Sequence, residues 1–206
     1  MNLNQYQVDR LVEEAQNGNM NAFGELYDIF FPHIHKYVYY KIGSDHADDL
    51  TGTIFMKSWL KLKKYRKTSY PFSAWLFRVA HNSVIDHYRT HRTFFELEEK
   101  IAEDDSRNPQ HLMEKTLNKE RVHRALHHLG KNYQEVLVLK FLNEMSNREV
   151  ADIMKTNESN VRTLQFRALK KMREVLEEQE APKKAEAVVE KKEPVGFLRR
   201  IFAKSS

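Results

Sequence analysis

Apolar residues recur mostly at three- and four-residue spacing along the 206 residues of this chain, and the two-residue alternation of a strand is nearly absent. Only six glycines interrupt this pattern, and 41% of the residues are hydrophobic, which is too apolar for a chain disordered throughout. The sequence therefore predicts an all-α protein.

The helical pattern falls into two blocks. In the first block, helices are expected over residues 4–17, 22–41, 44–64 and 72–92, with Ser44 or Asp45 capping the third. Pro32 should kink or break the second helix, because proline lacks a backbone donor. We expect two small helical domains, residues 1–92 and 119–179, joined by an acidic linker at 93–118. A low-complexity tail at 180–206 follows, ending in a short amphipathic basic tip.

Composition excludes several classes of protein. The chain has no cysteine, which rules out disulfides, thiolate catalysis and cysteine-ligated metals. It shows no signal peptide and no run of about 20 apolar residues, so no integral membrane segment and a cytoplasmic location are expected. There is no HExxH pattern, glycine-rich phosphate loop or nucleophile elbow. We therefore expect no enzyme, no cofactor and no metal site. The formal net charge of +5 favours an anionic partner only weakly.

The clearest local motif begins at Ser146. Ser146 and Glu149 have the spacing of a capping box, which starts a helix. A short turn at residues 155–157 follows, and Asn157 can cap the next helix. Two short helices with a tight turn between them are typical of a helix-turn-helix.

The exposed face expected on the second of these helices is polar and basic. Arginine can pair with guanine edges, and Ser, Thr and Asn can contact bases or phosphates. The alternative is an ordinary helical hairpin whose charged face is simply solvated. Neighbouring glutamates keep this alternative open. The candidate residues for contact with duplex DNA are Ser159, Asn160, Arg162, Thr163, Arg167, Lys170 and Lys171.

These motifs resemble a known family. Residues 134–141, 149–154 and 160–162 look like the fourth conserved region of sigma-70 family sigma factors. Residues 48–51 and 72–82, with Trp59 and Asp86, resemble the second region. The presence of these two regions, with little between them, is similar to the extracytoplasmic-function (ECF) branch.

The resemblance implies a sigma factor that binds core RNA polymerase and melts promoters to initiate transcription. The second domain would bind the minus-thirty-five element as duplex, and the first the minus-ten element as single strand. The acidic linker would run toward the polymerase cleft. An anti-sigma factor is a further candidate partner.

In the first domain, the helix expected at residues 72–92 carries a stripe of polar residues, and a basic, aromatic loop precedes this helix. Both suit an unpaired DNA strand, because cations follow the DNA backbone and aromatic rings stack on bases. The alternative is that the tyrosines pack the loop down and that Asp86 and Arg89 form an ordinary ion pair. The candidates for the minus-ten contact are Tyr65, Arg66, Lys67, Tyr70, Arg78, Asn82, Asp86 and Arg89.

The resemblance also places polymerase binding on the third helix, with Asp48, Asp49, Leu50 and Phe55 as candidates. The helix macrodipole alone would favour the two aspartates at that helix start. The chain has Gly52-Thr53 where the family often has a Gln-Glu pair, and Lys155 where the turn usually has glycine.

Two other functions stay open at this point. The chain could be a stand-alone helix-turn-helix regulator that binds its operator without polymerase, or a helical adaptor in which Arg162 and Arg167 have no role. The tip at 196–204 is either a docking peptide or a frayed end.

Overall fold

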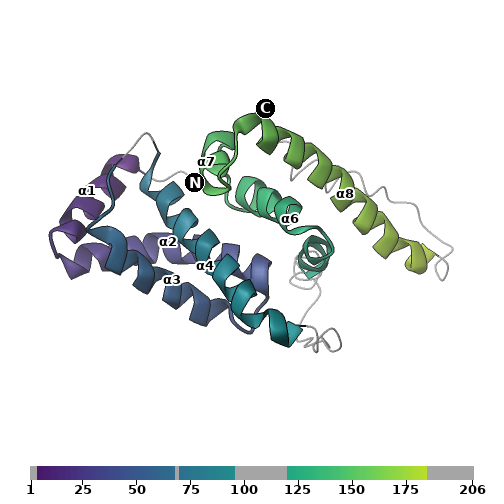
Figure 1. The fold of residues 1–206 in the computed structure, drawn as a ribbon, viewed down its shortest axis with the longest axis horizontal. Coiled ribbons are helices and arrows are strands. Elements are labelled where there is room, and N and C mark those ends of the chain that lie inside the picture. Colours follow the sequence, from purple (N-terminus) through teal and green to yellow (C-terminus); the bar gives the residue numbers. More distant parts are fainter. Residues whose placement is uncertain (1–3, 68–69, 96–119, 185–206) are drawn as a thin grey trace.

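A computed structural model describes residues 4–67, 70–95 and 120–184. These residues form helices joined by short turns, and no strand occurs among them. Figure 1 shows two groups of helices side by side, α1 to α4 in one and the helices after residue 120 in the other. The all-α prediction is confirmed for the part of the chain described.

The first group contains α1 (Gln5–Gln16), α2 (Met20–Ile42), α3 (Ala47–Leu62) and α4 (Phe72–Phe95). The side chains of Asn4 and Asn19 accept backbone N–H bonds and so start α1 and α2. The core is built from side chains spaced three and four residues apart on each helix, including Leu11, Phe30, Ile34, Tyr37, Ile54, Leu76 and Phe77. This regular burial packs α3 and α4 against α2. It thereby positions the candidate residues that α3, α4 and the loop between them carry.

Two local expectations for this group need correction: Pro32 does not break its helix, and neither Ser44 nor Asp45 caps α3. Helix α2 continues through Pro32, which lies between the buried side chains of Phe30 and Ile34. Burial of such a pair contributes more than the loss of one backbone hydrogen bond costs. Helix α3 has His46 as its N-cap, with no side-chain cap bond, while the Ser44 hydroxyl donates to Asp45 instead.

The second group begins with a helical segment at residues 120–127 and continues with α6 (Lys131–Leu137), the π-helical turn η1 (Val138–Leu142), α7 (Asn147–Ile153) and α8 (Glu158–Lys184). Its core includes Val136, Leu139, Val150, Ile153, Val161 and Ala168. Helix α8 extends past the expected boundary at residue 179.

The two groups also pack against each other. Helix α7 contacts α4, and η1 contacts α2. The sequence indicated two modules joined by a linker and did not indicate whether the modules contact each other. This packing brings residues of the helix-turn-helix onto the polar stripe of α4.

Candidate nucleic-acid interface

The helix-turn-helix has the local geometry that its sequence predicts. The Ser146 hydroxyl accepts from the Glu149 N–H at 3.2 Å, and the Glu149 carboxylate accepts from the Ser146 N–H at 2.8 Å. In the turn, Lys155 takes a left-handed conformation at φ 52°, the conformation glycine usually supplies. Asn157 Oδ1 then accepts from Asn160 N at 2.8 Å and caps α8. The predicted capping box and cap are confirmed.

The start of α8 presents its polar side chains to solvent. Val161, Ala168 and Met172 are buried beneath it, so the remaining positions form an outward face. The exposed residues include every predicted duplex candidate: Ser159, Asn160, Arg162, Thr163, Arg167, Lys170 and Lys171. This surface is called the reading face below.

One apolar side chain on the reading face was not predicted. Phe166 is 72% exposed and follows Arg162 and Thr163 by one helical turn. A phenyl ring in this position can contact a thymine methyl group. The sequence could have indicated this exposed position, because Phe166 is an apolar residue that does not share the spacing of the buried residues Val161, Ala168 and Met172.

The cations of the reading face are held only weakly. Arg162 lies 3.5 Å from Glu158, and Lys171 lies 3.1 Å from Glu174, with each of these side chains more than 40% exposed. Exposed pairs of this kind contribute about 0–1 kcal/mol, so a phosphate can displace the carboxylate at little cost.

The polar stripe of α4 is partly unpaired with other elements and partly paired with α7. Asn82, Asp86 and Arg89 are exposed, and Asp86 lies 3.5 Å from Arg89. Arg78 Nη1, in contrast, lies 3.3 and 3.2 Å from the two carboxylate oxygens of Asp152 on α7. The four residues therefore do not form one open surface.

The loop before α4 surrounds a pocket of about 360 Å³, lined by Lys64, Tyr65, Arg66, Tyr70, Pro71, Trp75, Arg78 and Asp152. Tyr65 is buried against Phe72 and Trp75, with ring centroids at 5.5 and 5.2 Å, and burial raises its pKa. Tyr65 therefore lines the pocket with a ring that two aromatic neighbours hold in place.

Of the other loop candidates, Arg66 and Tyr70 also line this pocket, whereas Lys67 does not. Arg66 donates to the carbonyl groups of Lys63 and Tyr65 at 3.1 Å. Lys67 lies 2.6 Å from Asp9 of α1, whose hydrogen bond raises the Lys67 pKa. The Arg148 guanidinium lies 5.1 Å from the centre of the Tyr70 ring.

The four polymerase candidates differ in accessibility. Asp48 is exposed and lies 2.9 Å from His35, Asp49 is exposed, and Leu50 is half-buried. Phe55 is only 4% exposed and packs against Tyr27, with ring centroids 4.6 Å apart. It lines an apolar groove of about 310 Å³ between α2 and α3, together with Met20, Phe23, Tyr27, Met56 and Trp59. The sequence did not indicate this groove.

No helix in the described part of the chain is both long enough and apolar enough to cross a membrane. Within the same residues, no three His, Asp or Glu side chains gather in a way that could hold a metal ion.

Comparisons with known proteins agree with this geometry. Residues 26–94 match the family model Sigma-70 region 2, and residues 119–172 match Sigma-70, region 4. The chain belongs to the sigma-70 family, in its ECF branch. The two matches span α2 to α4 and the helix-turn-helix, and leave α1 and the end of α8 outside.

Curated relatives of this sigma factor are ECF sigma factors. It is 33% identical to the ECF RNA polymerase sigma factor BldN of Streptomyces coelicolor over 81% of this chain and 64% of BldN. It is 26% identical to the ECF RNA polymerase sigma factor SigM of Bacillus subtilis over 72% of this chain and 91% of SigM. The chain therefore spans just under two thirds of BldN but most of SigM.

Solved structures extend the similarity to the fold. CnrH, solved in complex with the cytosolic domain of CnrY, aligns with a TM-score of 0.65 and 26% identity over 83% of this chain and 97% of CnrH. The sigma factor RpoE of Bartonella quintana, solved with the anti-sigma factor NepR, aligns with a TM-score of 0.63 at 20% identity. The second likeness concerns the fold alone.

Proposed function

We propose that this sigma factor directs core RNA polymerase to promoters through two modules with separate tasks. Residues 119–179 bind duplex DNA at the minus-thirty-five element, and residues 1–92 bind polymerase and hold the unpaired minus-ten strand. The linker and the tail predicted over residues 93–118 and 180–206 lie outside the described residues, except for residues 93–95, which belong to α4, and 180–184, which belong to α8. The exposed reading face, on a module attached to a region 2 fold, is the observation that carries this proposal.

Duplex recognition is assigned to the start of α8. Arg162 and Thr163 lie one helical turn before Phe166 on its exposed side, so an arginine fork, a hydroxyl and an apolar ring can face the same groove. Lys170 and Lys171 continue this side toward the flanking phosphates.

Strand binding is assigned to the pocket before α4 and to the α4 stripe. The pocket combines the rings of Tyr70 and Trp75 with the cation of Arg78. Aromatic rings supply stacking for an extruded base and a guanidinium attracts its phosphate, which together offset the cost of unstacking. Asn82 and Arg89 extend the stripe as exposed donors.

Polymerase binding is assigned to α3 and to the apolar groove beside it. Asp48 and Asp49 offer exposed carboxylates at one end of α3, while Phe55 and Met56 lie along the groove. An exposed apolar groove rimmed by charge is typical of a protein-binding surface. An anti-sigma factor as a further partner stays a prediction, in keeping with the complexes in which CnrH and RpoE were solved.

We infer that the chain itself catalyses no reaction and acts in the cytoplasm beside RNA polymerase. Its chemistry is DNA and protein binding through the surfaces above. A stand-alone regulator remains the alternative, and it differs in one respect: it binds its operator tightly without polymerase.

Run-off transcription with core polymerase on a library of bacterial promoters tests the proposal. Discrete transcripts that require the chain are expected, together with weak promoter binding by the chain alone. An Arg162→Ala, Arg167→Ala double variant should lose these transcripts. Arg10→Ala is a matched control, because Arg10 has the same i,i+4 pairing at 3.5 Å on α1, far from α8 in Figure 1. The absence of any start site with intact core enzyme contradicts the proposal.

A further inference from the structure

A single side-chain amide of α1 holds the chain where it leaves α3. Gln16 is the last residue of α1 and lies half-buried beside the segment that follows α3. Its Nε2 donates to the Leu62 carbonyl at 2.9 Å and to the Tyr65 carbonyl at 2.8 Å. Leu62 ends α3 and Tyr65 comes three residues later, so one amide joins the end of this helix to the turn after it.

The two bonds from Gln16 reinforce a turn that the backbone already makes. Tyr65 N donates to the Leu62 carbonyl at 2.9 Å, and Arg66 Nη1 donates to the Tyr65 carbonyl at 3.1 Å. A carbonyl oxygen has two lone pairs and can accept two hydrogen bonds, so both acceptors are fully used. The direction in which the chain leaves α3 is therefore fixed by contacts from two elements.

Helix α1 is a firm support for this turn. Its inner side is packed into the core through four residues that are no more than 4% exposed: Val8, Leu11, Val12 and Ala15. Gln16 follows this series directly. A second contact from α1 reaches the same segment, because Asp9 lies 2.6 Å from Lys67 Nζ. The segment after α3 is thus tied to α1 at two points.

The turn held by Gln16 forms part of the loop pocket. Lys64, Tyr65 and Arg66 line this pocket from the loop, whereas Trp75 and Arg78 line it from α4. The rings of Tyr65 and Trp75 lie 5.2 Å apart. A shift of the Tyr65 backbone would therefore change the spacing between the loop side and the α4 side of the pocket.

We propose that Gln16 is a positioning residue for the recognition of an unpaired base: its amide fixes the backbone of residues 62–65 and so sets the spacing of the pocket between the loop and α4. This rests on the proposed function, because the pocket is the proposed strand-binding site. A pocket that is ordered before binding spends little of the binding free energy on ordering when a base enters.

Contacts with bases and with phosphates respond differently to a loosened turn. A base inside the pocket needs the loop and α4 at a fixed spacing. A base that stays outside is bound only through phosphate contacts, which depend little on that spacing. Loss of the Gln16 amide should therefore weaken binding of a preferred base and leave binding of a disfavoured base nearly unchanged. The ratio of the two dissociation constants measures the difference.

Binding of single-stranded oligonucleotides to the complex of the full-length chain with core polymerase tests the proposal. The oligonucleotides carry the minus-ten segment of a promoter found by run-off transcription, with each of the four bases at each position in turn. Gln16→Met retains the length of the side chain but removes its donor. It should lower the largest ratio about five- to tenfold, as expected for the loss of two hydrogen bonds.

Two further variants separate the donor from the shape of the side chain. Gln16→Glu keeps the shape of the amide but has no donor at neutral pH, so it should lower the ratio as Gln16→Met does. Gln7→Met is the matched control, because Gln7 is exposed on the same helix, and it should keep the wild-type ratio. Helix content by circular dichroism and binding of the duplex upstream element should stay at wild-type values in all three variants.

A wild-type ratio in either Gln16 variant overturns the positioning role. An equal loss of binding to the duplex upstream element also overturns it, because that loss indicates damage to the whole fold. A wild-type complex that prefers no base at any minus-ten position overturns the proposed strand binding itself, and the role of Gln16 with it. Failure of Gln16 alone and failure of the proposed function are therefore distinguishable.

Discussion

Ser146 and Glu149 cap one another at the start of α7, each side chain accepting the other's backbone N–H, at 3.2 and 2.8 Å. Ser146→Ala removes the acceptor for Glu149 N and should destabilise the second module by about 0.5–2 kcal/mol. Thermal denaturation followed by circular dichroism measures the loss. Ser159→Ala is the control, because Ser159 is exposed within α8 and caps no helix start; an equal loss in both variants contradicts the capping role.

Gly52 lies within α3, where glycine lowers the stability of the helix relative to alanine. A Cβ at this position meets nothing within 4 Å, and the residue is exposed. Gly52→Ala should therefore stabilise the first module by about 0.5–1 kcal/mol, because alanine loses less backbone entropy in a helix. Chemical denaturation measures the gain. A Gly18→Ala variant should give the opposite sign, since Gly18 has φ 95°.

Arg162 is expected to set affinity for the upstream promoter element. Arg162→Ala should weaken binding of the polymerase–sigma complex to that element by about 1–3 kcal/mol, the range for one lost arginine–guanine pair. Competition between promoter duplexes with and without the upstream element measures this effect. Glu158→Gln, which removes only the carboxylate beside Arg162, should leave recognition intact. Equal weakening on both duplexes would contradict base recognition.

Asn82 is expected to act later, during promoter opening. It is exposed on α4 between the half-buried Arg78, which pairs with Asp152, and the exposed Asp86. Asn82→Ala should reduce permanganate reactivity of the minus-ten region while initial complex formation stays near wild type, because only the unpaired strand reaches this stripe. The Arg162→Ala variant should show the reverse pattern. Identical melting defects in the two variants contradict this division.

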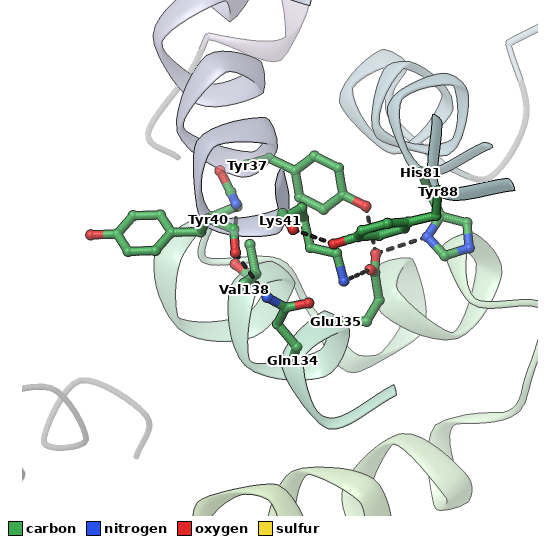
Figure 2. Close-up of polar contacts among 9 residues, drawn as sticks. Tyr37, Tyr40, Lys41, His81, Tyr88, Gln134, Glu135 and Val138 are labelled. Atoms are coloured by element: carbon green, nitrogen blue, oxygen red, sulfur yellow. Dashed lines mark hydrogen bonds and ion pairs between the residues drawn. The ribbon is translucent and has the colours of Figure 1, made fainter. Parts of the chain in front are cut away.

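The packing of α6 against α2 should be stable through neutral pH and weaken in acid. Glu135 of α6 lies 2.9 Å from Lys41 Nζ of α2 (Figure 2), and its pKa is lowered from an ordinary 4.5 to about 2, so its carboxylate stabilises the fold above pH 4.5. This contribution falls as pH drops from 4.5 toward 2, where protonation ends the pairing with Lys41. Thermal denaturation followed by circular dichroism across this range, for the wild-type and Glu135→Gln chains, measures the loss. The same pH dependence in both chains would contradict Glu135 as the controlling group.

Local structure could be predicted because its causes are local. The periodicity of Val161, Ala168 and Met172 defines which side of α8 is buried, so the exposed candidates followed directly. The capping box and Asn157 lie within a few residues of the atoms they bond. The left-handed conformation of Lys155, in contrast, was indicated only by the resemblance, because the family usually has glycine at this position of the turn.

The relation between the modules could not be predicted in this way. Glu135 reads in the sequence as one acidic residue on a short helix, and its partner Tyr37 lies 98 residues earlier. Likewise Arg78 was placed correctly on a polar stripe, but Asp152, which pairs with it, comes 74 residues later. The pattern of apolar residues determined which faces are buried. Only the packed chain decided which polar face meets which, because that choice depends on long-range fit and charge pairing that neighbouring residues do not encode.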